Sequence, residues 1–446
     1  MKKFEMVYES IKNDIQAGRL KQGDALPSIR QLSQTFECSK GTIVKALDLL
    51  VAHHTIFSKP QSGFYVADNL SAPTEQERGY VLDTGNPKIN LLGTNNIQHL
   101  LTIALTQYAN RHLNVPANGL TSVLELAPDY LAEQSVYADS SNIYIIQGVM
   151  QILNMLSLQP FPNGKKKILI EEPTYPMYVE YLHSLGLPVI TIKRDEHGLD
   201  MQELERIFKN EDIKFFYCIP RNHNPLGTML SFSQRKRMME LAVKYDVYIV
   251  EDDYLGDAHK APKYVPMHYL SAGQNSIYIR SFSKELPFVR FGFCVISKPL
   301  KEMFEEIVYK SYFISYNMPD LIAQATWEAY IKTSIYRSHT TSYSREISKK
   351  LHLLTQITSK WDKSLIKVIG GYSGLYCTLV LSSKITADTL VERLASKKVF
   401  VRSNRVSYYC REDYDNSIRL SIAQVSSDGL AESLEIIYQT ILEMVP

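Results

Sequence analysis

The stretch Tyr278-Ile-Arg-Ser281-Phe-Ser283-Lys284 decides the fold of the larger part of this chain. β-Favouring residues fill its first half, two serines follow, and a lysine closes it. This order predicts a buried strand that ends in hydroxyls and one amine at the edge of a sheet, where α/β proteins bind their ligands. Because a lysine amine can form a Schiff base with an aldehyde, Lys284 is the candidate catalytic residue.

Similar runs precede this stretch and alternate with helical patterns from about Asn86 onward. Alternation of this kind predicts an α/β fold, with a mostly parallel sheet covered by helices. Side chains that directly follow each strand are therefore the candidates for ligand binding. The predicted strands are residues 143–146, 167–171, 189–192, 215–219, 247–250 and 276–279.

The first 70 residues follow a different pattern. Apolar residues recur at helical spacing from Phe4 to Ile15, and Ser28 and Ser39 can each cap a further short helix. Residues 55–58 and 64–66 predict a two-stranded wing around a turn. Two short helices across a tight turn, followed by a wing, predict an α+β winged helix-turn-helix in residues 1–70.

A winged helix-turn-helix binds double-stranded DNA with the third helix in the major groove. Residues 1–70 contain nine Lys and Arg and seven Asp and Glu. They therefore account for the whole formal net charge of the chain, which is +2. The prediction therefore depends on motif geometry rather than on bulk charge. The candidate DNA-binding residues are Arg30, Ser39, Lys40, Thr42, Lys45, Lys59 and Gln61.

Composition limits the remaining possibilities. A chain of 446 residues with 45% hydrophobic residues allows two to four domains. Its five cysteines lack paired spacing, which predicts reduced thiols, no metal site and a cytoplasmic location. The sequence contains no run of about 20 apolar residues, so no membrane span is predicted. Its first residues lack the apolar core of a signal peptide.

Four motifs resemble the GntR family of regulators, specifically its MocR subgroup: Gly18-Arg-Leu, Leu26-Pro-Ser-Ile-Arg30, Ser39-Lys-Gly-Thr42 and Gly63-Phe-Tyr-Val66. The resemblance covers residues 1–70. The polar, proline-containing residues 71–85 predict a linker. The resemblance implies that a fold type I aminotransferase-like domain follows in residues 86–446, which binds pyridoxal 5'-phosphate and forms a homodimer.

The motifs after the predicted strands match that implied domain. Gly148, Val149 and Met150 open a helix whose amides can hold a phosphate, although Val149 replaces the small polar residue usual in the family. By resemblance, Tyr175 stacks on the cofactor ring, Asn224 and Tyr254 bind its phenolate oxygen, and Asp252 faces the ring nitrogen, with Asp253 as the alternative. Ser281, Ser283 and Arg290 are assigned to the phosphate, and Arg419 to an effector or substrate carboxylate.

The sequence leaves three functions open. The fused DNA-binding module favours a transcriptional regulator that senses an amino acid, an amine or pyridoxal phosphate itself. The same residues are those of an aminotransferase, so transamination is the second interpretation. A dimerisation scaffold without cofactor is the third.

Overall fold

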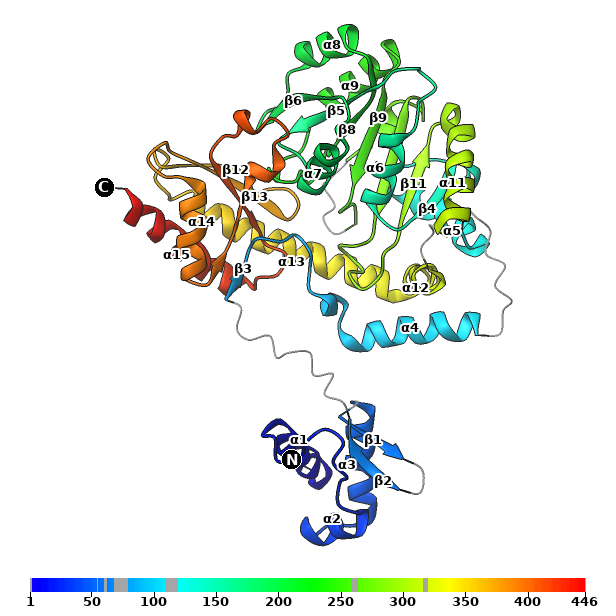
Figure 1. Cartoon of the computed structure of the whole chain (residues 1–446), viewed down its shortest axis with the longest axis vertical. Coiled ribbons are helices and arrows are strands. Elements are labelled where there is room, and N and C mark those ends of the chain that lie inside the picture. The colour runs from blue at the N-terminus through cyan, green and yellow to red at the C-terminus, as the bar shows by residue number, and fades with distance from the viewer. Residues whose placement is uncertain are drawn as a thin grey trace. The chain divides into compact units, whose positions relative to one another are not determined.

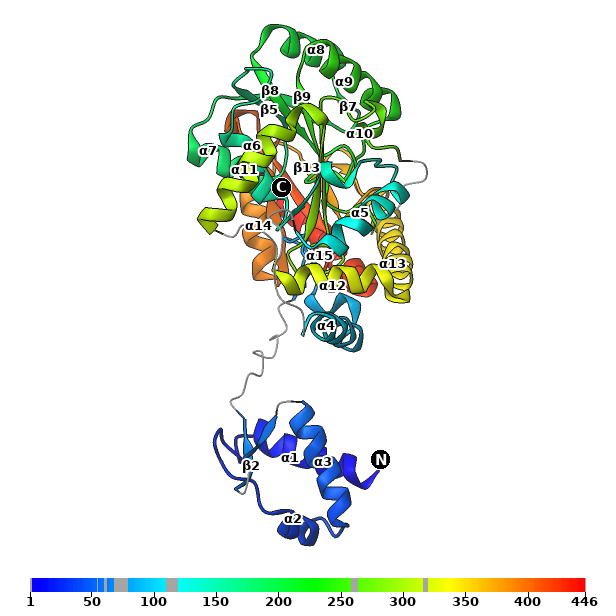
Figure 2. The same cartoon turned by 90° about the vertical axis from the view of Figure 1, so that its right-hand side faces the viewer.

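The structure is a computed structural model that describes residues 2–53, 55–59, 62–67, 79–109, 119–257, 264–315 and 320–445. The chain divides into two compact units, Met1–Arg78 and Gly79–Pro446, which Figure 1 and Figure 2 show in two views. Within the described ranges, no helix combines the length and the apolar character needed to cross a membrane.

The first unit is the predicted winged helix-turn-helix. Its elements are α1 (Lys3–Gln16), α2 (Ile29–Thr35), α3 (Lys40–Ala52) and the antiparallel strands β1 (Ile56–Lys59) and β2 (Gly63–Val66). The Ser28 hydroxyl accepts a hydrogen bond from the Gln31 amide at 3.3 Å, and the Ser39 hydroxyl accepts one from the Thr42 amide at 3.2 Å. Both helices therefore begin at the predicted serines, whose side chains satisfy amides at the helix start. The inner face of α3, formed by Ile43, Ala46, Leu47 and Leu50, is fully buried.

The second unit contains an eight-stranded sheet in the order β4-β11-β10-β9-β8-β5-β6-β7. All six predicted strands are present, as β4, β5, β6, β8, β9 and β10. Strand β11 is an additional, antiparallel strand between β4 and β10. The strands are β4 (Ile143–Ile146), β5 (Lys167–Glu172), β6 (Val189–Asp195), β7 (Gly198–Leu199), β8 (Ile213–Cys218), β9 (Tyr248–Asp253), β10 (Ser276–Ser281) and β11 (Gly292–Ile296).

Helices cover both faces of this sheet (Figure 2). Successive residues of a strand point to opposite faces, so Ile168 and Ile170 pack with the helices of one face and Leu169 packs with those of the other. The first face carries α6 (Val149–Leu158), α7 (Pro176–Leu185) and α11 (Lys301–Ser315); the second carries α8 (Met201–Asn210), α9 (Phe232–Lys244) and α10 (Met267–Leu270). Burial on both faces explains why the strands are continuous apolar runs.

A second, four-stranded sheet lies in the C-terminal part of this unit, in the order β12-β13-β16-β15. Its strands are β12 (Ile366–Gly370), β13 (Tyr376–Leu381), β15 (Arg402–Ser403) and β16 (Ser417–Ser421). The remaining helices of the unit are α4 (Thr94–Tyr108), α5 (Thr121–Glu133), α12 (Leu321–Lys332), α13 (Ser334–Thr358), α14 (Ala387–Ser396) and α15 (Ser427–Met444).

The expected linker, residues 71–85, extends too far along the chain. Strand β3 (Tyr80–Val81) pairs in parallel with β14 (Val399–Phe400), so residues 79–85 belong to the second unit. A two-residue strand in a polar stretch has too few residues to show a periodic pattern, which is why the sequence did not reveal it.

Candidate functional site

A cavity of about 470 Å³ lies where β4, β8, β9 and β10 end. It brings together residues that lie as far apart in the chain as Asn86 and Tyr376. Every candidate cofactor-binding residue lines it. The predicted members are Gly148, Val149, Met150, Tyr175, Asn224, Asp252, Tyr254, Ser281, Ser283, Lys284 and Arg290, and the others are Asn86, Gln147, Gln151, Met177, Ile219 and Tyr376.

Lys284 follows β10 and projects into this cavity. Its ammonium nitrogen donates a hydrogen bond to Asn86 Oδ1 at 2.7 Å. Burial lowers the pKa of Lys284 to about 8, and the positive charges of Arg419 and Arg290 act in the same direction. About one tenth of the amine is therefore neutral at pH 7, far more than for an unperturbed lysine, and the neutral form is the one that attacks a carbonyl carbon.

Asp252 and Asp253 end β9 in different environments. Asp252 Oδ2 accepts a hydrogen bond from the Tyr217 hydroxyl at 2.7 Å, whereas the buried Oδ1 has no partner among the described residues. Burial raises the pKa of Asp252 to about 7. Asp253 instead forms a buried ion pair with Arg221, with Nε and Oδ1 2.7 Å apart, and this charge helps to lower its pKa. Only Asp252 lines the cavity.

One end of the cavity is suited to an anion. Gly148 has φ of 137°, which favours glycine, and it precedes the first turn of α6, whose amide groups carry partial positive charge. A side chain added at Gly148 would meet nothing within 4 Å, so the backbone faces open space. The hydroxyls of Ser281 and Ser283 are 2.6 Å apart, and these serines and Arg290 line the same cavity. Arg290, six residues after Lys284 in the chain, therefore reaches the cavity.

Arg419 lies in β16, between β13 and β15, rather than on an edge strand. Only 4% of the residue is exposed, and it does not line the cavity directly. Its Nη1 donates to Asn224 Oδ1 at 3.0 Å, and its guanidinium lies 4.7 Å from the centre of the Tyr376 ring. The Tyr254 hydroxyl donates to the Asn222 carbonyl at 2.6 Å. Arg419 thus contacts the cavity through Asn224 and Tyr376, both of which line it.

Several residues of the site were not predicted, and three of them, Asn86, Tyr217 and Tyr376, contact predicted site residues. Asn86 lies in a segment without a recognisable motif, and Tyr217 lies inside β8, where an aromatic residue predicts only a strand. Tyr376 begins β13, directly after a glycine turn. The alternation of side chains along β8 could have pointed to Tyr217. This residue faces the same side of the sheet as Phe215 and lies two residues before the end of the predicted buried run, close to the edge where ligands bind.

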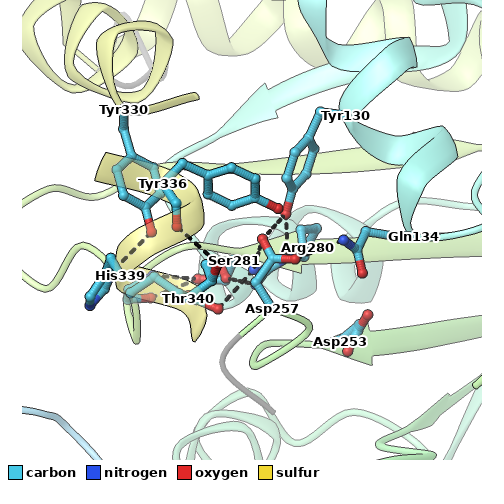
Figure 3. A network of polar contacts seen from close by, with 12 residues as sticks. Tyr130, Gln134, Asp253, Asp257, Arg280, Ser281, Tyr330, Tyr336, His339 and Thr340 are labelled. Atoms are coloured by element: carbon cyan, nitrogen blue, oxygen red, sulfur yellow. Dashed lines mark hydrogen bonds and ion pairs between the residues drawn. The ribbon is translucent and has the colours of Figure 1, made fainter. Parts of the chain in front are cut away.

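A buried polar network supports the turn that carries Lys284 (Figure 3). Arg280, which is fully buried, donates to Glu285 Oε1 at 2.8 Å and to Asp257 Oδ2 at 3.2 Å. The Tyr130 hydroxyl donates to the same Asp257 oxygen at 2.6 Å. Because the network joins both flanks of Ser281–Lys284 to α5, it restricts the backbone that positions the amine.

The predicted DNA-binding residues that the structure describes lie mainly on the surface of the first unit. Arg30, Lys40, Lys45 and Lys59 are exposed, and the hydroxyls of Ser39 and Thr42 are 2.9 Å apart. The Lys45 ammonium lies 4.6 Å from the centre of the Phe4 ring, so this side chain contacts α1. Gln61 lies outside the described residues.

Geometry and comparison together define the class: a winged helix joined to a domain with the aminotransferase fold. Residues 3–66 match the family "Bacterial regulatory proteins, gntR family", and residues 87–437 match "Aminotransferase class I and II". Two solved enzymes are similar in fold. They are the α-aminoadipate aminotransferase LysN of Thermus thermophilus (TM-score 0.73, 19% identity, 82% of this chain and 93% of that one) and the Pyrococcus horikoshii kynurenine aminotransferase (TM-score 0.73, 21% identity, 90% and 95%).

Whole-chain relatives carry both parts. The chain is 34% identical over 445 residues to YcxD of Bacillus subtilis (strain 168), described as an uncharacterized HTH-type transcriptional regulator, across 98% of this chain and 99% of that one. It is 24% identical to the HTH-type transcriptional regulator NorG of Staphylococcus aureus (strain USA300), across 93% and 98%. The chain belongs to the MocR-type regulators of the GntR family, as its motifs predicted.

Proposed function

We propose that this regulator binds operator DNA through its first unit and holds pyridoxal 5'-phosphate on Lys284 in its second unit. Occupancy of the cavity by the cofactor, an amino acid or an amine then sets the affinity for DNA. The observation that carries the proposal is the meeting of Lys284, Asp252 and the α6 N-terminus in one cavity. A DNA-binding unit on the same chain favours sensing over metabolism as the purpose of that cavity.

The residues present fit the cofactor. Asp252 Oδ1 is a buried acceptor without a partner among the described residues, and a protonated pyridine nitrogen would satisfy it. The open space in front of Gly148 suits a phosphate dianion, and Ser281, Ser283 and Arg290, which line the same cavity, would donate hydrogen bonds to it. Tyr175, which the α7 N-terminus holds at the cavity wall, offers a ring face.

Pyridoxal phosphate, when bound, supplies an aldehyde for amines and a ring that withdraws electrons from the attached carbon. The chain supplies the rest. Lys284 provides the amine, and Asp252 would keep the proton on the ring nitrogen. Asn224 and Tyr254 would bind the phenolate oxygen, and Arg419 would bind a ligand carboxylate with its planar guanidinium.

Transamination is the second candidate, because the lowered pKa of Lys284 also suits a residue that moves a proton. Conversion of a stoichiometric amount of an L-amino acid to its oxo acid by the loaded protein would support it. A cofactor-free scaffold is disfavoured, because a scaffold would need neither the unpartnered buried oxygen of Asp252 nor the lowered pKa of Lys284.

The active form is proposed to be a homodimer acting in the cytoplasm. Two winged helices related by a two-fold axis would contact two half-sites about one or more helical turns apart. Sedimentation of the full chain should therefore give twice the 51.0 kDa mass of the chain. A monomer at micromolar concentration would contradict this part of the proposal.

The cofactor proposal is tested by incubation with pyridoxal phosphate, reduction with borohydride and peptide mass analysis. The wild type should gain a visible absorbance band and, after reduction, a phosphopyridoxyl group on Lys284. Lys284→Ala should fold but give neither signal, and Lys298→Ala, an exposed lysine of the same unit, serves as the matched control. An adduct on another lysine, or none in the wild type, would contradict the proposal.

A further inference from the structure

Residues 79–86, called here the connecting segment, begin the second unit and end at Asn86, which lines the cavity. They are the first residues of the second unit, and the linker joins them to the winged helix. Figure 1 shows β3, which lies in this segment, beside the C-terminal sheet. Along the chain, the segment therefore lies between the linker and the residues of the second unit that follow it.

The beginning of the segment is fixed by backbone hydrogen bonds. The amides of Tyr80 and Leu82 donate to the carbonyls of Lys398 and Phe400, each at 2.8 Å, and the Ser421 amide donates to the Leu82 carbonyl at 2.8 Å. A side chain on Gly79 would lie 2.1 Å from the Lys398 carbonyl oxygen, so the chain needs glycine there. None of these contacts involves a side chain that lines the cavity.

The end of the segment is held by the ligand-binding groups themselves. Lys284 donates to Asn86 Oδ1 at 2.7 Å, and Arg419 donates through Nη2 to the Asp83 carbonyl. A side chain on Gly85 would lie 1.7 Å from the Tyr376 hydroxyl oxygen, so the segment lies directly against the ring that packs on Arg419. A third contact is independent of both: Gln424 Nε2 donates to the Asn86 carbonyl at 2.9 Å.

A ligand would compete for two of these three contacts. The Asp83 carbonyl is a neutral acceptor, whereas a carboxylate on Arg419 forms charge-assisted hydrogen bonds that are roughly twice as strong. Condensation of the neutral Lys284 amine with an aldehyde forms one C=N bond and releases one water, made of the aldehyde oxygen and both amine hydrogens. Asn86 Oδ1 then loses its present donor.

Resting on the proposed function, we propose that Asp83 and Asn86 sense occupancy of the cavity. Arg419 and Lys284 hold the connecting segment in the free protein, and a ligand that takes these groups releases its end. The ligand shifts the population of segment conformations because it binds the released form better. Asp83 contributes only its backbone, so Asn86 and Gln424 are the positions at which side-chain substitution tests the idea.

The test uses full-length protein and a DNA duplex obtained by in vitro selection with the wild type. The probes are pyridoxal 5'-phosphate, whose aldehyde condenses with Lys284, and N-(5'-phosphopyridoxyl)-L-alanine, whose carboxylate competes for Arg419. The DNA dissociation constant is measured with and without each probe for the wild type, Asn86→Ala, Gln424→Ala and the control Asn90→Ala, an exposed asparagine of the following turn. Hydrogen exchange of the peptide covering residues 79–86 is followed in parallel.

In the wild type and Asn90→Ala, each probe should change the DNA dissociation constant at least about fivefold and alter exchange in residues 79–86. The change should fall below about twofold in Asn86→Ala and Gln424→Ala, because their segments are already partly released. A wild-type response that survives both substitutions, or unaltered exchange in the segment, would overturn this inference alone. A wild type whose DNA affinity ignores a bound probe would overturn the proposed function as well.

Discussion

At the scale of single residues, the pKa of Lys284 makes its reactivity depend on pH in a defined way. Only the neutral amine attacks an aldehyde, and burial lowers the pKa of this lysine to about 8. The rate of adduct formation with pyridoxal phosphate should rise about tenfold per pH unit below 8 and level off above it. Stopped-flow absorbance between pH 6 and 10.5 measures this rate. A rate that still rises above pH 10 would indicate an ordinary, exposed lysine.

Neutralising Asp252 and neutralising Asp253 should have different effects on stability and on cofactor binding. Asp253→Asn leaves buried Arg221 without its charge partner and should lower the free energy of unfolding by about 3–5 kcal/mol. Asp252→Asn keeps an acceptor for Tyr217 and should change that free energy by less than about 1 kcal/mol, while weakening cofactor binding roughly tenfold or more.

Fluorescence during urea unfolding separates these effects, because both tryptophans, Trp327 and Trp361, are buried in the second unit. Absorbance titration with pyridoxal phosphate gives the affinity. The reverse order, with Asp252→Asn unfolding easily and Asp253→Asn losing the cofactor, would show that the two roles are exchanged.

Residue identities in the cavity were predictable where a motif follows a strand. Position after a buried run marked Gly148, Asn224 and Lys284, because parallel strands bring their carboxyl ends to one edge. Asn86 could not be found in this way, since its place depends on the pairing of β3 with β14, which lies far away in the chain. The choice between Asp252 and Asp253 likewise needed the position of Arg221.

At the scale of elements, α3 is the helix expected to read DNA. Lys40 is exposed at its first turn, so Lys40→Ala should remove one phosphate contact and lower the slope of log affinity against log salt by about one. Thr42→Ala should instead change base preference, with little effect on that slope. Titrations of the selected DNA at several salt concentrations measure both effects.

Lys363→Ala, in the second unit, is the matched loss of one positive charge. If it lowered the slope as much as Lys40→Ala does, the effect would be one of net charge and α3 would have no special role. The contact of Lys45 with the Phe4 ring shows a limit of helical patterns: they assign an outward face but not the packing of a long side chain across to another helix.

Helices and strands were predicted well where the sequence carries a clear capping residue or a continuous apolar run. The capped helices α2 and α3 and the buried strands β4, β5 and β8 follow directly from serine caps and apolar runs. Strand β11 was not predicted, because Gly292–Ile296 follows the lysine turn closely and its antiparallel pairing with β10 and β4 is fixed by tertiary contacts.

At the scale of the whole molecule, two compact units share one chain, and the second of them holds a cavity lined by titratable groups suited to an aldehyde. If the ligand and the DNA prefer different conformations of the protein, their binding is linked. The factor by which the ligand changes the affinity for DNA then equals the factor by which DNA changes the affinity for the ligand.

The most direct test of this account is the affinity of the full-length wild type for its selected DNA duplex, measured before and after loading with pyridoxal 5'-phosphate or N-(5'-phosphopyridoxyl)-L-alanine. We expect at least one of the two to change the dissociation constant about fivefold or more at constant salt. Equal dissociation constants for the free protein and for both fully loaded forms would contradict it.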